Sequence, residues 1–353
     1  MERKIRMKNN LYVDIHVLQS VPPSCINRDD TGSPKTAKYG GVVRARVSSQ
    51  AWKHEMRKMF KEMLSAEEVG VRTKKVSQMI ASAVKEIDSN IEEEKADKLA
   101  LQAMGTAGIK TDKDGLSPVL IFFSAAQAKA LANLAIQESK DKKEYQNALK
   151  MAPSMDMALF GRMVAADPSL NFDAASQVAH AISTHAVHNE YDYFTAVDDL
   201  LQDEESGAGH LGTVEFNSAT LYRYATVNIM ELQKNLGAQT ETAVKCFVEA
   251  FIKAMPTGKQ NTFANRTLPD FVYITLRTDQ PVNLVGAFEK QVSGVNGYLE
   301  ESEKRFKEYA DTIYQKFACP PEKVWEFGEM NILQILEGLT FEIKEKISES
   351  RGE

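Results

Sequence analysis

The stretch from Ser24 to Arg57 reads SCINRDDTGSPKTAKYGGVVRARVSSQAWKHEMR, a loop rich in Lys, Arg and Gly that runs into a helix beginning near Ser48. Between Arg28 and Lys61 there are nine basic and three acidic residues, although the whole chain has a formal net charge of −6. The rest of the chain therefore carries −12. An anionic partner responds to charges within about 8 to 10 Å, one Debye length, so this acidic chain can still offer a cationic surface to nucleic acid.

The predicted helix that follows this loop has two faces. Its apolar residues recur at helical spacing: Trp52, Met56, Met59, Phe60 and Met63. Lys53, Arg57 and Lys61 recur every four residues and form a second, cationic face. A Ser at the helix start leaves backbone N–H groups at the positive end of the helix dipole, which is a phosphate-binding geometry. A solvated charged face on an ordinary helix has the same spacing, but the adjoining Gly40-Gly41 turn and basic strand favour binding.

Longer strings then point to a family. NRDDTGSPKTAKYGG followed by RARVSSQAWK resembles the backbone subunits of type I-E CRISPR Cascade complexes, the CasC family of the RAMP superfamily. Four more matches follow in the same order: GRM at Gly161, HAISTHAVHNEYDYFTAVDDL from His180, HLGTVEFNSATLYRYATVNI from His210 and PTGKQNTFANRTLPDF from Pro256. The resemblance covers most of the first 290 residues, roughly, and no comparable string lies between Val295 and Glu353.

Residue periodicity predicts an α+β fold interrupted by a long helical insertion. Strands are expected at Leu11–Leu18, Thr220–Ile229 and Phe271–Arg277. Helices are expected at Lys74–Ile87, Ile91–Met104, Ser124–Ser139, Lys142–Met151, Phe172–Val187 and Thr240–Met255. The resemblance implies a modified RRM or ferredoxin-like palm with helical fingers and a β-hairpin thumb. Its expected segments are 1–66 for the first part of the palm, 67–180 for the fingers, 181–217 for the thumb, and 218–353 for the rest of the palm and C-terminal helices.

In the resembled family the basic loop and helix grip the guide RNA by its sugar–phosphate backbone. The matching positions are Asn27, Arg28, Lys35, Ser48, Ser49, Gln50, Lys53 and Arg57. Phosphate contacts fix the register of a nucleic acid without reading its sequence. This suits a subunit that must accept any guide.

The segment from His188 to Phe216 contains many acids and no Lys or Arg. Phosphates repel such a segment, so we expect RNA contacts only through its apolar tip at Phe194, Thr195 and Leu211. The resemblance implies that this is the thumb, which crosses the guide and displaces a base. The charges suggest that its acids, Asp198 and Asp199 among them, dock on the basic palm of a neighbouring copy. An acidic loop that is exposed to solvent and contacts nothing would have the same composition.

Three further groups of candidate site residues each have two possible interpretations. Met163 is either a core residue or, by the match at GRM, a wedge against a splayed base. On one regular helix His180 and His185 point about 140° apart, so these histidines and His188 favour structural roles over a metal site. The pair Asp29-Asp30 either caps the loop or holds Mg²⁺ for RNA cleavage.

The rest of the sequence narrows the function classes. Three widely spaced cysteines form no disulfide or zinc pattern and fit a reducing cytoplasm. No stretch is apolar enough for export or membrane insertion, and no nucleotide-binding, serine-nucleophile or RNP1 motif occurs. We expect no cofactor and no metal.

Together with these patterns, the resemblance implies a cytoplasmic, non-catalytic subunit that polymerises in several copies along a CRISPR RNA and presents it for pairing with target DNA. The resemblance implies further partners: the guide-processing endonuclease, a subunit at the guide's 5′ end, small subunits and a large subunit. Two other readings stay open, a metal-dependent endoribonuclease using Asp29 or Asp30 and an RNA chaperone acting as a monomer.

Overall fold

The computed structural model describes residues 10–163, 168–195 and 211–351. Contacts divide the chain into two compact units. Unit 1 comprises Met1–Met56, Val178–Thr226 and Val248–Gly338, and unit 2 comprises Arg57–Gln177, Val227–Phe247 and Leu339–Glu353. Each unit is therefore assembled from segments that lie far apart in the sequence.

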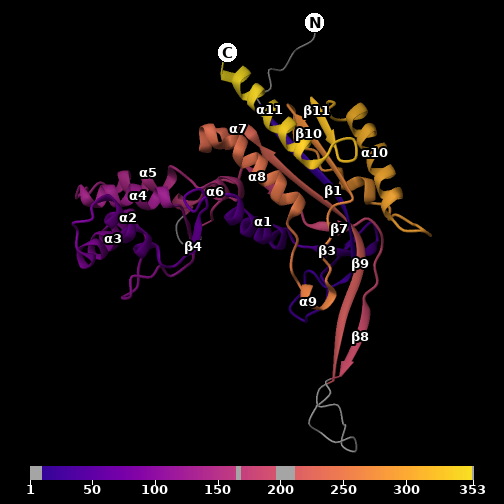
Figure 1. The fold of residues 1–353 in the computed structure, drawn as a ribbon, viewed down its shortest axis with the longest axis horizontal. Helices are drawn as coiled ribbons and strands as arrows, with labels where there is room; N and C mark the ends of the chain where they lie inside the picture. The colour runs from indigo at the N-terminus through magenta and orange to yellow at the C-terminus, as the bar shows by residue number, and fades with distance from the viewer. Residues whose placement is uncertain (1–9, 164–167, 196–210, 352–353) are drawn as a thin grey trace, which may run out of the picture. The chain divides into compact units, whose positions relative to one another are not determined.

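Unit 1 is built on a largely antiparallel sheet with the strand order β11-β10-β1-β9-β7-β3-β2 (Figure 1). Its strands are β1 (Tyr12–Ser24), β2 (Thr36–Tyr39), β3 (Val42–Val47), β7 (Ala181–Ser183), β9 (Leu211–Asn228), β10 (Phe271–Arg277) and β11 (Lys323–Glu326). The strand β8 (Glu190–Thr195) pairs with the first part of β9, and this hairpin projects from the sheet. The 18-residue strand β9 thus runs from the hairpin into the palm.

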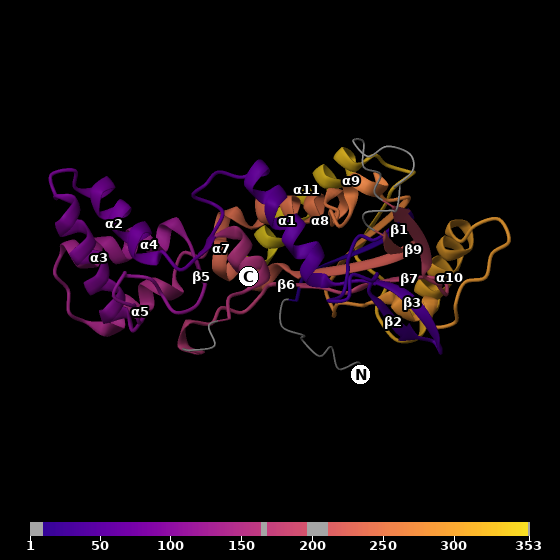
Figure 2. The same cartoon turned by 90° about the horizontal axis from the view of Figure 1, so that it is seen from below.

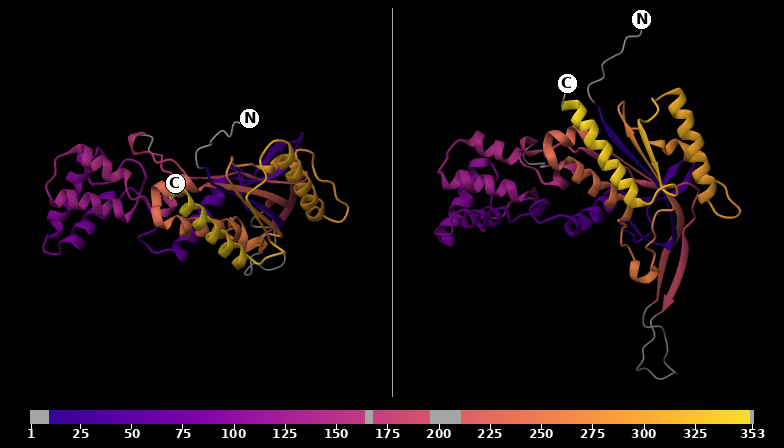
Figure 3. Two further views of the ribbon diagram at one scale, coloured as in Figure 1. Left: turned by 90° about the horizontal axis from the view of Figure 1, so that it is seen from above. Right: turned by 45° about the horizontal axis from the view of Figure 1, so that its top comes forward.

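One face of this sheet is covered by α10 (Leu299–Lys316) and the 3-10 turn η4 (Leu284–Phe288), as Figure 3 shows for the orange helix. Alternation along β1 places Leu18 and its even-numbered neighbours on this face. The Phe306 ring of α10 lies edge-on to Phe271 and Tyr273, with ring centroids 5.4 and 5.3 Å apart. Aromatic packing of this kind holds the helix on the sheet.

Two titratable side chains of β1 are buried under α10. The Asp14 carboxylate accepts hydrogen bonds from the Tyr224 hydroxyl at 3.0 Å and the Val282 amide at 2.8 Å, and burial raises its pKa to about 6. His16 Nδ1 lies 2.8 Å from the Tyr222 hydroxyl oxygen. Burial lowers the pKa of His16 to about 3, because a charged imidazolium is poorly solvated there.

These shifts make stability depend on pH in opposite directions. An unfolded His has a pKa of 6.5, so the stability that neutral His16 contributes is present above that pH and is lost as the pH falls toward about 3, by up to about 1.4 kcal/mol per pH unit. Asp14 holds its proton in the folded state between pH 3.8 and about 6, so its contribution decreases as the pH rises through that window.

We expect His16→Gln, which can hydrogen-bond to Tyr222 but does not titrate, to flatten the decline of the unfolding free energy below pH 6.5. Urea unfolding at pH 7, 6, 5 and 4 measures the slope. The exposed His188→Gln is the matched control and should keep the wild-type slope. Equal slopes for wild type and His16→Gln would contradict the neutral state of His16.

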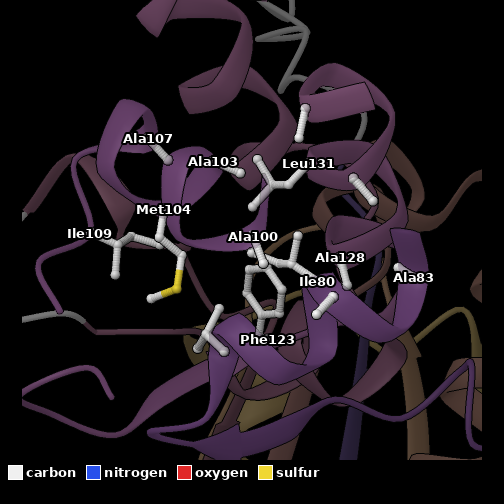
Figure 4. Close-up of a cluster of buried hydrophobic side chains, with 14 of the residues drawn as sticks. Ile80, Ala83, Ala100, Ala103, Met104, Ala107, Ile109, Phe123, Ala128 and Leu131 are labelled. Atoms are coloured by element: carbon white, nitrogen blue, oxygen red, sulfur yellow. The ribbon is translucent and has the colours of Figure 1, made fainter. Parts of the chain in front are cut away.

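Unit 2 contains a helical core (Figure 2). It is formed by α2 (Val76–Ile87), α3 (Glu93–Ala107), α4 (Ala125–Ile136) and α5 (Lys142–Lys150), with the short hairpin of β4 (Val71–Thr73) and β5 (Ile121–Phe123). Ile80, Met104, Phe123 and Leu131 point into one cluster (Figure 4), surrounded by alanines that let the helices approach closely.

The remaining helices and one short strand complete the two units. They are α1 (Ser49–Met63), α6 (Met155–Phe160), η1 (Pro168–Leu170), β6 (Ser176–Val178), α7 (Ile229–Leu236), η3 (Gly237–Gln239), α8 (Thr240–Lys253), α9 (Gln260–Phe263) and α11 (Ile332–Arg351). Within the described residues, none of the helices combines the length and apolarity needed to cross a bilayer.

The predicted α+β fold is confirmed, and most predicted elements agree with the structure to within a few residues at their ends. The helix expected at Phe172–Val187 is wrong. This segment holds β6 and β7, and Ile182 of β7 pairs with Arg46 on one side and Tyr222 on the other. Backbone hydrogen bonds to both neighbouring strands outweigh the helix-like spacing of its apolar residues.

Candidate nucleic-acid interface

The basic hairpin of β2 and β3 is held against the palm by its turn and by a buried arginine. Gly40 has φ +59°, and a Cβ there would lie 1.6 Å from the Glu289 carbonyl oxygen, so only glycine fits. Arg44 is fully buried and donates to the carbonyl oxygens of Tyr39, Ser183 and Phe288 at 3.2, 3.0 and 2.9 Å. Arg44 therefore belongs to the framework of the palm.

The loop before this hairpin is ordered by its own polar groups. The Asn27 carbonyl accepts from the Lys35 amide at 2.9 Å. One Asp29 carboxylate oxygen accepts from the Thr31 amide and hydroxyl at 2.9 and 2.7 Å and from the Ser33 amide at 3.1 Å. These bonds, that of the Thr31 hydroxyl above all, lower the pKa of Asp29. The loop-capping role considered for Asp29 is the one that this geometry shows.

The part of the chain that the structure describes can be assessed for metal ligands. No group of three or more His, Cys, Asp or Glu side chains among the described residues could hold a metal ion. Asp30 is exposed next to Asp29.

The start of α1 differs from the expected array of open amides. The Ser48 amide donates to the Asn27 side-chain oxygen at 2.8 Å, and the Ala51 amide lies 3.3 Å from the Ser48 hydroxyl. Ser48 and Ser49 are buried, whereas Gln50 is exposed. The Ser48 and Ala51 amides are thus paired within the protein, and phosphate binding at this helix start stays a prediction.

Three cations act electrostatically on His180, the residue just before β7. Arg46 Nη1 lies 3.3 Å from His180 Nδ1, and Arg46 Nε donates to the Thr36 carbonyl at 3.1 Å. Partial burial, followed by the charges of Arg46, Lys35 and Lys53, lowers the pKa of His180. We call Lys35, Arg46, Lys53 and His180 the His180 cluster.

The His180 cluster joins residues from four separate places in unit 1: a loop, β3, α1 and the start of β7. Lys35 and Lys53 are among the positions that the sequence predicts, whereas Arg46 and His180 are not. The basic string RAR could have pointed to Arg46, its second arginine. His180 lies more than a hundred residues away, and nothing in the sequence around it indicates that it contacts Arg46.

Arg57 has an internal partner in unit 2. Its Nε donates to the fully buried Asp156 carboxylate at 3.0 Å and its Nη2 to the Gly70 carbonyl at 3.2 Å, while its guanidinium lies 4.5 Å from the Phe122 ring centroid. Its cationic group is thus used for packing and ion pairing.

We expect Arg57→Ala to reduce the unfolding free energy by about 3 kcal/mol, because the buried Asp156 carboxylate loses its cation. Lys53→Ala, on the same helix, should reduce it by less than about 1 kcal/mol. Chemical denaturation of the two variants measures the difference. Similar losses for both variants would show that the ion pair of Arg57 is not important for stability.

The β8–β9 hairpin lies in the segment where the thumb is expected, and we call this hairpin the thumb. Phe194 pairs with Gly212, where a Cβ would come within 2.3 Å of the Phe194 ring, so the ring lies over this glycine. Thr195 is exposed and pairs with Leu211, whose side chain lies outside the described residues. Asp198 and Asp199 also lie outside them, so their docking on a neighbour stays a prediction.

Two tyrosines on the thumb were not predicted from the sequence. Tyr191 and Tyr193 are 67% and 62% exposed, and their spacing of two puts them on the same face of the hairpin. The sequence feature that could have indicated them is the presence of aromatic residues in an otherwise acidic segment. They give the thumb a flat, partly apolar surface.

Met163 and the GRM string lie in unit 2. Arg162 is buried and donates to the carbonyl oxygens of Leu170 and Leu149 at 2.7 and 2.8 Å, and burial lowers its pKa to about 10. The neighbouring Met163 is 86% exposed and borders a cavity lined by Phe160 and Phe172. Arg162 anchors the string, and the core interpretation of Met163 is wrong.

His185 has the structural role expected of it. Its Nε2 accepts from the Thr220 amide at 3.1 Å and its Nδ1 lies 2.8 Å from the Ala186 carbonyl oxygen. Its ring stacks on Tyr298 with centroids 3.6 Å apart. Burial lowers the pKa of His185, so the ring is neutral and both nitrogens are used.

Comparison with known proteins adds the relatives of this chain. A chain of a "CRISPR RNA-guided surveillance complex, pre-nicking" is 35% identical with a TM-score of 0.75, over 89% of this chain and 90% of that one. A chain of another "CRISPR RNA-guided surveillance complex" is 30% identical with a TM-score of 0.58, over 89% and 87%. The similarity to chains of CRISPR RNA-guided surveillance complexes thus extends over most of this chain.

The family can be stated directly. Residues 13–348 match the family described as CT1975-like protein, Cas_CT1975. The chain belongs to the CT1975-like family. No protein with a curated description matches it.

Proposed function

We propose that this protein is the non-catalytic backbone subunit of a type I-E Cascade-type complex, a CasC-like member of the RAMP superfamily that binds CRISPR RNA. The observation that carries the proposal is the His180 cluster, where cations from a loop, a strand and a helix gather on one surface of unit 1. The similarity to chains of CRISPR RNA-guided surveillance complexes supports RNA as the anion.

The geometry suits an RNA grip that ignores sequence. Lys35, Arg46 and Lys53 can neutralise phosphates, which are the same in every nucleotide. Arg28 and Gln50 are exposed and are also proposed to contact RNA. Asn27, Ser48 and Ser49 are proposed to support this surface, since the Asn27 side chain holds the Ser48 amide at the start of α1.

The thumb adds contacts of a different kind. The exposed rings of Phe194, Tyr191 and Tyr193 offer stacking surfaces, which accept any base because every base has a π face. Thr195, Leu211 and Met163 complete the proposed RNA-contacting set as small or adaptable groups that can lie against a displaced base.

The proposed assembly contains several copies, because the guide RNA is proposed to be longer than the stretch that one subunit binds. Several copies lie head to tail along the CRISPR RNA, whose bases pair with target DNA. The other proposed partners are the guide-processing endonuclease, the 5′-end subunit, the small subunits and the large subunit.

The double variant Lys35→Ala/Lys53→Ala tests the grip. We expect it to weaken binding to guide-length RNAs of unrelated sequence by similar factors and to reduce the slope of log affinity against log salt by up to about two. Filter binding at several salt concentrations measures both. Lys98→Ala/Lys234→Ala removes two exposed, acid-paired lysines and should match wild type. A loss confined to some sequences would contradict backbone recognition.

An endoribonuclease is the alternative function. Asp29 uses one carboxylate oxygen for three hydrogen bonds inside its loop, which supports a structural role and favours the non-catalytic reading. We expect the assembled complex with complementary RNA and Mg²⁺ to leave that RNA intact on a denaturing gel. Regularly spaced cuts that disappear in Asp30→Ala would overturn the proposal in favour of cleavage.

A further inference from the structure

The charged groups that act on the ring of His180 are all cations. His180 is exposed just before β7, an interior strand of the unit 1 sheet, with a ring nitrogen 3.3 Å from the guanidinium of Arg46. The charged groups that act on its ring come from three elements: Lys35 from the loop before β2, Arg46 from β3 and Lys53 from α1.

The contact with Arg46 defines the state of the free ring. A guanidinium can only donate, so His180 Nδ1 accepts and the single proton of the neutral ring is on Nε2. A second proton on Nδ1 would face the Arg46 guanidinium and break this hydrogen bond. The free protein therefore disfavours the imidazolium form, and the lowered pKa of His180 agrees with this.

A phosphate placed among these cations would reverse the balance. Its negative charge would offset the field of Lys35, Arg46 and Lys53, and its oxygens would accept hydrogen bonds from an imidazolium. Arg46 could then turn its guanidinium to the phosphate, leaving Nδ1 free to carry a proton.

We propose that His180 is a proton-linked contact for the RNA backbone, which takes up a proton when a phosphodiester enters the His180 cluster. This inference rests on the proposed RNA-binding function and adds to it a residue and a dependence on pH. No bond is made or broken other than the N–H bond formed with a proton from solvent.

The sign of the effect follows from linkage. If RNA binding raises the pKa of His180, the complex holds more protons than the free protein in the window between the two values. Affinity for RNA then increases as the pH falls through that window, by up to about tenfold for each unit by which the pKa rises.

The test uses the full-length protein and a guide-length RNA of mixed sequence at constant ionic strength. Affinity is measured by fluorescence anisotropy from pH 8.5 to pH 5.5, for wild type, His180→Gln and the matched control His54→Gln. His54 is another exposed histidine, and its Nε2 lies 3.8 Å from a carboxylate oxygen of Glu55. Calorimetry in two buffers of different ionisation enthalpy then counts the protons taken up on binding.

We expect wild type and His54→Gln to bind more tightly on acidification, by three- to tenfold, and to take up a fraction of a proton near pH 6.5. His180→Gln should show a flatter pH profile than wild type, with less proton uptake on binding. If His180→Gln keeps the wild-type profile and proton uptake, the inference is overturned while RNA binding stands. If wild type binds no RNA at any pH, the proposed function fails together with it.

Discussion

A single buried cation ties together the elements that carry the proposed interface. Arg223 of β9 lies between the rings of Trp52 and Phe251, with its guanidinium carbon 3.8 and 4.7 Å from their centroids. It donates to the Gln19 side chain at 2.6 Å and to the Phe251 carbonyl. These contacts join β9, β1, the first half of α1 and the end of α8. Burial lowers the pKa of Arg223 to about 9, so it is still charged at neutral pH.

The consequence is geometric. An unpaired charge in this position would be strongly destabilising, so the two rings and two oxygen acceptors must stay in place around it. Because β9 continues into the thumb and α1 carries Lys53, the same constraint positions both proposed RNA-contacting surfaces of unit 1. A grip that tolerates any guide sequence still needs cations at fixed spacing, since the phosphates themselves are regularly spaced.

The number of basic residues therefore overstates the positive charge that is available at the surface. Of the basic residues between Arg28 and Lys61, Arg44 is buried on backbone carbonyls and Arg57 is paired with Asp156. Arginine suits such sites because it keeps its charge and donates in several directions, whereas lysine is left at the surface. The excess of basic residues is real, but Arg44 stabilises the interior of unit 1 and Arg57 that of unit 2.

The amino-acid sequence by itself determined the α+β class, the long helices of the fingers, the basic loop and the amphipathic helix α1, because these depend on local periodicity and composition. It also singled out Lys35 and Lys53. Only the tertiary structure decided that Phe172–Val187 forms strands, because sheet pairing with β3 and β9 supplies hydrogen bonds that no local pattern records. For the same reason it alone brought His180 beside Arg46, made Met163 a surface residue and gave Arg57 a buried acid as its partner: each depends on chain segments that meet only after folding.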